Sequence, residues 1–114
     1  MQFQFNSDHT VMGTENVAER IEAMMREKLA RFEDRLTRLE VHVRDVNGTK
    51  HGADDKECTI EARPRGGKPI GVHGKADKVD DAARKAANTL AQRLERHFGK
   101  SEKHKHDARP DKVI

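Results

Sequence analysis

The feature that most constrains the fold is a change of hydrophobic period along the chain. Apolar residues alternate with polar ones in four short segments, at 2–6, 37–46, 58–63 and 70–72. Such alternation places one face of a β-strand in the core and the other in water. Between the first and second segments, and again after the fourth, apolar residues recur instead at the spacing of an amphipathic α-helix. The predicted order of elements is therefore β-α-β-β-β-α.

Each helix is bounded by residues that favour helix ends. The first is expected to start after Thr14, which can act as an N-cap, and to run for about five turns as far as Phe32. The second is expected to start after Asp77, another capping residue, and to end at Gly99. Two such helices need a common apolar surface to cover.

A four-stranded sheet with one buried face supplies that surface. Residues 46–55 are rich in turn formers and indicate an exposed loop between the second and third strands. Residues 64–68 contain two glycines, which suit a tight hairpin, so the third and fourth strands should be antiparallel. The sequence therefore predicts an α+β fold, a two-layer sandwich with both helices on one face of a four-stranded sheet.

The length and composition suit a single domain. In 114 residues, 33% hydrophobic residues leave material for one thin core, and 38% charged residues require a densely charged surface. Residues 1–99 are predicted to form this domain. Residues 100–114 are polar and charged, have no apolar period, and are expected to form a disordered basic tail that contains histidines.

Membrane and secreted classes have no support in the sequence. The only cysteine, Cys58, cannot form an intramolecular disulfide, and no signal peptide is recognised at the amino terminus. A cytoplasmic location is therefore expected. No apolar run approaches the roughly 20 residues that cross a bilayer, so no membrane partner is expected.

Catalysis also lacks candidate residues. Cys58 falls on the inward side of its strand and is interpreted as a small buried hydrophobe, and Asp77 and Asp80 are interpreted as helix-capping acids. His104 and His106 have no specific metal-ligand spacing and stand beside lysines that repel cations. No phosphate-binding loop or metal motif occurs. We expect no enzyme activity, cofactor, metal site or small-molecule substrate.

Charge divides the chain into an acidic and a basic half. Residues 1–57 hold 9 lysines and arginines against 12 acids, whereas residues 58–114 hold 14 against 8. The formal net charge of +3 is too small by itself to indicate a nucleic-acid partner, so the distribution of charge matters more. The basic half is the candidate contact surface.

Several local strings, in their order and spacing, resemble a known family. They are residues 1–6 (MQFQFN), 29–35 (LARFEDR), 58–64 (CTIEARP) and 90–97 (LAQRLERH). Together with the order of elements, they resemble the short form of the bacterial ribosome hibernation-promoting factor and ribosome-associated inhibitor family, over roughly residues 1–99. One departure is Thr89, where familiar members have a lysine.

The resemblance implies a function in translation. Members of this family sit between the head and body of the small ribosomal subunit, occlude the messenger and transfer RNA sites, and keep ribosomes idle. The implied partners are the 30S subunit and the 70S ribosome, with contact mainly to 16S ribosomal RNA. Long members carry a further carboxy-terminal domain that pairs ribosomes, and this chain looks like a short form.

A polar stripe on the last helix is the main candidate for RNA contact. It consists of Lys78, Lys85, Gln92 and Arg96, spaced by one turn or one heptad. Periodicity alone favours an ordinary solvated face, whereas the resemblance favours RNA, because cations that displace counterions from phosphate add salt-sensitive affinity. The hairpin also has two interpretations: a plain turn with solubilising charges, or a turn whose Gly66 and Gly67 amides could approach phosphates. The candidate RNA-binding residues are Arg63, Arg65, Lys68, Lys75, Lys78, Arg84, Lys85, Gln92, Arg93 and Arg96.

Recognition by base stacking has little support. The chain has no tyrosine or tryptophan, and its four phenylalanines are mostly assigned to the core, so recognition by shape and backbone is expected. Two other functions stay open: another RNA-binding or stress-associated module on the same fold, and a protein-interaction domain without RNA.

Overall fold

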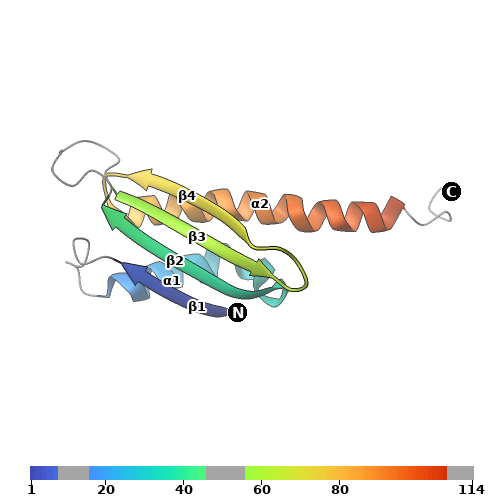
Figure 1. Ribbon diagram of the computed structural model, residues 1–114, viewed down its shortest axis with the longest axis horizontal. Helices are drawn as coiled ribbons and strands as arrows, with labels where there is room; N and C mark the ends of the chain where they lie inside the picture. Colours follow the sequence, from blue (N-terminus) through green and yellow to red (C-terminus); the bar gives the residue numbers. More distant parts are fainter. Residues whose placement is uncertain (8–15, 46–55, 108–114) are drawn as a thin grey trace.

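The four strands form one sheet in chain order. The computed structural model describes residues 1–7, 16–45 and 56–107, with side chains as far as residue 99. β1 runs parallel to β2, and the other neighbouring strands are antiparallel. Both helices lie on one side of the sheet (Figure 1), so the predicted order and two-layer α+β fold are confirmed. The elements are β1 (Gln2–Ser7), α1 (Val17–Lys28), η1 (Ala30–Arg35), β2 (Leu36–Asp45), β3 (Lys56–Pro64), β4 (Ile70–Ala76) and α2 (Val79–Asp107).

The core lies between the sheet and the helices. Among the described side chains, no polar or charged residue is buried. Burial raises the pKa of the Cys58 thiol to about 12, because the charged thiolate is poorly solvated there, as suits a cysteine that serves as packing material. The central strands contribute buried residues in directly opposed pairs: Leu39 with Ala62, Val41 with Ile60, and Val43 with Cys58.

The first helix differs from the prediction. Its N-cap is Asn16, which has a left-handed backbone (φ 65°), and the predicted cap at Thr14 lies outside the described residues. The α-helix ends at Lys28 with Leu29 as its C-cap, and the 3₁₀-helix η1 follows. The expected single helix of about five turns is therefore wrong. Leu29 and Phe32 are both buried, and their spacing of three residues suits either helix type, so periodicity could not reveal the change.

α2 begins one residue later than its predicted cap implied. The amide of Ala82 donates to the carbonyl of Lys78 at 2.9 Å, so Lys78 occupies the capping position in place of Asp77. Two acids, Asp80 and Asp81, lie in the first turn, where they interact favourably with the helix dipole.

α2 continues past its predicted end. The expected stop at Gly99 is wrong, since the helical backbone extends to Asp107 and projects beyond the sheet (Figure 1). A glycine ends a helix when it turns left-handed, and Gly99 has no positive φ; inside a helix it costs only about 1 kcal/mol. The domain boundary at residue 99 and the disordered tail remain predictions, and residues 46–55 and 108–114 lie outside the described residues. Within the described part of the chain, no helix is both long and apolar enough to span a bilayer.

Candidate nucleic-acid interface

The polar stripe predicted on the last helix lies on the solvent side of α2. Lys78, Lys85, Gln92 and Arg96 are all exposed. The opposite side of the helix, which is rich in alanine and leucine, is buried against the sheet. The stripe can therefore meet a partner without any disturbance of the core.

A glycine brings this helix close to the edge strand β4. A Cβ atom on Gly74 would lie 2.8 Å from the carbonyl oxygen of Ala82 and 2.7 Å from the amide nitrogen of Ala86. Only glycine fits this approach. Beside it, the Nζ of Lys85 donates to the carbonyl oxygen of Lys75 at 3.1 Å. The stripe on α2 and the backbone of β4 therefore form one continuous border of the molecule.

The β3–β4 hairpin is held against the rest of the domain. Its turn uses Gly66 at a positive φ of 70°, and Arg65 donates from Nε to the carbonyl oxygen of Asp34 at 2.7 Å. The amide of Gly67 donates within the turn to the carbonyl of Pro64 at 3.3 Å. That amide is already engaged, which weakens the expectation that both glycine amides could approach a phosphate.

The hairpin also lies close to the middle of α2, at His97. A Cβ atom on Gly67 would lie 3.7 Å from Nε2 of His97. Lys68 is exposed in the hairpin, and Arg93 and Arg96 are exposed on the neighbouring part of α2. These three cations therefore belong to the same end of the molecule.

Two of the predicted residues lie on the other face of the sheet. Arg63 and Lys75 alternate with buried neighbours in β3 and β4, so their side chains leave from the face that the helices do not cover. The guanidinium of Arg63 is 3.4 Å from the carboxylate of Glu61, which partly neutralises it. All ten predicted residues are exposed, but they occupy two faces that meet along β4.

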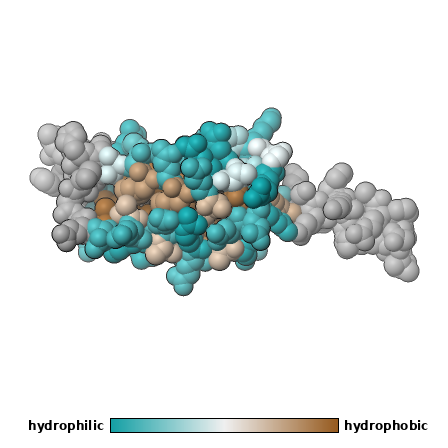
Figure 2. Space-filling model, turned by 90° about the horizontal axis from the view of Figure 1, so that it is seen from below, coloured by the Kyte–Doolittle hydropathy of each residue, from teal (hydrophilic) through white to brown (hydrophobic). Residues whose placement is uncertain are grey.

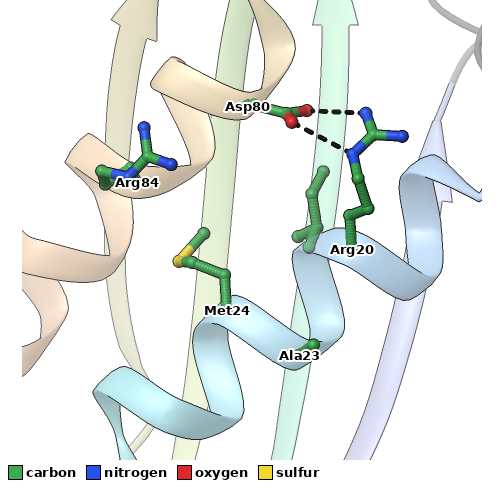
Figure 3. A pocket seen from close by; sticks show the side chains of 6 residues that line it. Arg20, Ala23, Met24, Asp80 and Arg84 are labelled. Carbon is green, nitrogen blue, oxygen red and sulfur yellow. Dashed lines mark hydrogen bonds and ion pairs between the residues drawn. The ribbon is translucent and has the colours of Figure 1, made fainter.

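Arg84 lies on the flank of α2 that faces α1. It pairs with Asp81 at 3.0 Å and borders a cavity of about 360 Å³ whose apolar wall includes Met24. Figure 3 shows Asp80 and Arg20 joined across this gap, with nitrogen–oxygen distances of 3.1 and 3.2 Å. The hydrogen bond to Asp80 raises the pKa of Arg20. Both arginines already face carboxylates, so this flank offers little positive charge to phosphate.

The border formed by β4, its hairpin and the exposed side of α2 differs from this flank, because cations there have no carboxylate partner among the described side chains. Six of the exposed cations that lack a carboxylate within ion-pair distance among the described side chains lie along this border, and we call them the basic band. Elsewhere, cations such as Arg31 and Arg44 lie 3.3 and 2.9 Å from Glu95 and Glu57. A cation without a partner can meet a phosphate without first breaking an ion pair. The basic band consists of Lys68, Lys75, Lys78, Lys85, Arg93 and Arg96.

A comparison with family profiles identifies the domain. The family described as "Sigma 54 modulation protein / S30EA ribosomal protein" matches residues 7–102, from the end of β1 into the projecting part of α2. This chain belongs to that family. The S30EA family match confirms the resemblance inferred from the local strings of the sequence. No curated protein sequence matches the chain significantly.

Two solved structures share the fold of this S30EA family member. A ribosomal subunit interface protein from Coxiella burnetii superimposes with a TM-score of 0.67 at 17% identity, over 87% of this chain and 99% of that chain. The N-terminal domain of Protein Y from Thermus thermophilus gives a TM-score of 0.63 at 18% identity, over 85% and 99%. At these identities the likeness shows the fold alone.

Sequence reasoning missed the residues that shape the interface of this family member. Gly74 and His97 carry no cation, yet they set how closely β4 and the hairpin approach α2. For Gly74, the available signal was a glycine at a position of β4 that points toward the core, where its neighbours on the same side are apolar. Nothing in the local sequence indicates the contact of His97 with the hairpin.

Proposed function

We propose that the protein binds the small ribosomal subunit in the cytoplasm through 16S ribosomal RNA and silences idle ribosomes. The observation that carries the proposal is the basic band, whose cations are exposed and lack carboxylate partners in the described structure. Membership of the S30EA family, and the names of the two structural neighbours, support a ribosomal partner.

The chemistry of the band suits the phosphate backbone better than the bases. Lysine and arginine displace counterions condensed on RNA, which gives affinity without sequence preference. Phe3 and Phe5 lie on the side of β1 that packs against the core, so neither offers a ring on the open face of the sheet. Binding by shape and charge fits a folded ribosomal RNA surface.

The direct experiment is co-sedimentation of the purified protein with 30S and 70S particles across a salt series. Each phosphate contact should add about 0.7–0.9 to the slope of log affinity against log salt. Lys85→Glu combined with Arg96→Glu should abolish association and leave thermal stability within about 0.5 kcal/mol, since both residues are exposed. An in vitro translation assay should show inhibition by the wild type and none by the double variant.

Lys28 provides a matched control. Like Lys85, it is an exposed helical lysine without a carboxylate partner in the described structure, but it belongs to α1 and not to the basic band. Lys28→Glu changes the net charge as Lys85→Glu does, so it should bind ribosomes far better. Equal losses would mean that net charge alone drives association.

Other outcomes would assign a different partner. Equal affinity for unrelated structured RNA and for 30S particles would indicate another RNA-binding role for the same band. Affinity that stays flat between low and moderate salt would contradict docking on phosphate and favour a protein partner.

A further inference from the structure

β1 ends the sheet on the side away from α2. Within the described residues, it pairs with β2 and has no strand on its outer edge. An open edge presents unpaired N–H and C=O groups to any strand that approaches. Folded proteins usually protect such an edge with charged residues, proline or a bulge.

β1 has none of these protections. Its sequence, Gln-Phe-Gln-Phe-Asn-Ser, contains no charged residue, proline or glycine, and its register with β2 is unbroken. The opposite edge, β4, is different. It contains Lys75, and Lys68 and Pro69 precede it directly in the chain. The carbonyl oxygen of Lys75 also accepts a hydrogen bond from the side chain of Lys85. Of the two sheet edges, β1 is therefore the one at which a further strand can pair.

The core is incompletely covered beside β1. Phe3 and Phe5 pack against the core but remain partly exposed. The guanidinium of Arg26 lies 6.0 Å from the centre of the Phe3 ring, and its Nη2 is 3.5 Å from the carbonyl oxygen of Met1. Figure 2, which views the molecule from below relative to Figure 1 and so from the side of β1, shows an apolar band between hydrophilic borders. An unprotected strand edge and partly covered phenyl rings lie together.

We propose that a second copy of this chain docks here by antiparallel pairing of β1 with β1. Two copies related by a twofold axis bring a residue i opposite residue 8 − i when Gln4 lies on the axis. Phe3 then faces Phe5 of the other copy on the helix side, and Gln2 faces Asn6 on the open side. Aromatic pairs and amide pairs of this kind stabilise neighbouring strands.

Self-complementarity favours a second copy over a foreign strand. β1 has no charge that would select an oppositely charged partner, and no like charges meet within the paired strands. The two-copy arrangement would be one eight-stranded sheet with every helix on the same face. The basic band lies at the β4 end of each sheet, so pairing through β1 leaves it accessible. The inference therefore does not rest on the proposed function.

Sedimentation velocity over a concentration series up to about 1 mM tests the pairing. The wild type should shift from monomer to dimer. Gln4→Lys should remain monomeric, because two lysines would meet at the axis. Gln4→Glu places a carboxylate there, and an equimolar mixture of the two variants should form heterodimers. Because Arg38 contacts Gln4 and offsets part of the glutamate charge, the lysine variant is the decisive single change.

Thr59→Lys is the matched control. Thr59 is exposed on the same face but belongs to the central strand β3, so the added charge should leave the dimer intact. Circular dichroism would establish that each variant folds. A wild type that stays monomeric throughout the series, a mixture that stays monomeric, or equal loss of the dimer in Thr59→Lys would overturn the proposal. Gln4→Lys should still co-sediment with ribosomes if the proposed function holds, which separates the two tests.

Discussion

Replacement of Gly74 by alanine tests the closest approach between the sheet and α2. The new Cβ would lie 2.7 Å from the amide nitrogen of Ala86 and 2.8 Å from the carbonyl oxygen of Ala82, whereas ordinary contacts lie at 3.4–4 Å. Both atoms belong to the helix backbone, so neither can rotate away. β4 and α2 would have to separate by several tenths of an ångström along a packed interface.

The cost follows from overpacking. Forcing an extra methyl group into a well-packed core costs about 1–3 kcal/mol, and the backbone contacts at Gly74 place this site in the upper half of that range. A glycine-to-alanine change at a position whose backbone suits alanine also stabilises by about 0.4–1 kcal/mol, because it restricts the unfolded chain. Gly71→Ala carries only this second effect, since Gly71 lies in the same strand and a Cβ there would meet nothing within 4 Å.

The difference between the two variants isolates the steric effect, because their unfolded chains change alike. Gly74→Ala should be less stable than Gly71→Ala by about 2–3 kcal/mol, which corresponds to roughly 10–20 °C in Tm for a domain of this size. Urea unfolding followed by circular dichroism measures the difference directly. Equal urea midpoints for the two variants would refute the close packing of α2 on β4.

Four further outcomes are expected. Because burial holds the pKa of Cys58 at about 12, above the ordinary 9.0, the neutral thiol's contribution to stability is complete below pH 9 and falls as the pH rises toward 12. The difference in unfolding free energy between wild type and Cys58→Ala should narrow across that window, and a constant difference would contradict the buried thiol. Thr89→Lys adds an exposed cation to α2 and should steepen the salt dependence of ribosome binding by about 0.7–0.9; an unchanged slope would place this turn outside the interface. Arg84→Gln should leave that slope unaltered, since Asp81 already neutralises Arg84. Deletion of residues 101–114 should keep the fold and most of the ribosome affinity, as measured by circular dichroism and co-sedimentation, whereas complete loss of binding would make the tail the primary contact.

Much of the fold could be predicted because its strands are buried on one face only. A strand with one wet face shows a clear alternation, as Leu39, Val41 and Val43 do, and the alternation also fixes which side faces the helices. The polar stripe on α2 was equally visible, since helical spacing alone separates Lys85 from the buried side. Features that depend on periodicity within one segment are therefore accessible from sequence.

Features that depend on contacts between distant segments were not accessible. Arg20 meets Asp80 across 60 positions of the chain, and no local pattern connects them. The neutralisation of some cations and not others, which defines the basic band, is likewise a product of packing. Arg63 was grouped with the stripe on charge alone, yet it emerges on the opposite face of the sheet. Local sequence shows where cations are, but not which acids they meet.

The parallel pairing of β1 with β2 has a consequence for the order of folding. Gln2 pairs with Arg38, so β1 must wait for α1, η1 and β2 before it can join the sheet. β3, β4 and α2 follow one another closely and can form by local contacts, which are kinetically faster than distant ones. An intermediate that lacks β1 would expose β2 as a second open edge, together with a free strand of uncharged glutamine and phenylalanine. The aggregation of this chain during refolding should therefore be governed by how quickly its first seven residues are captured.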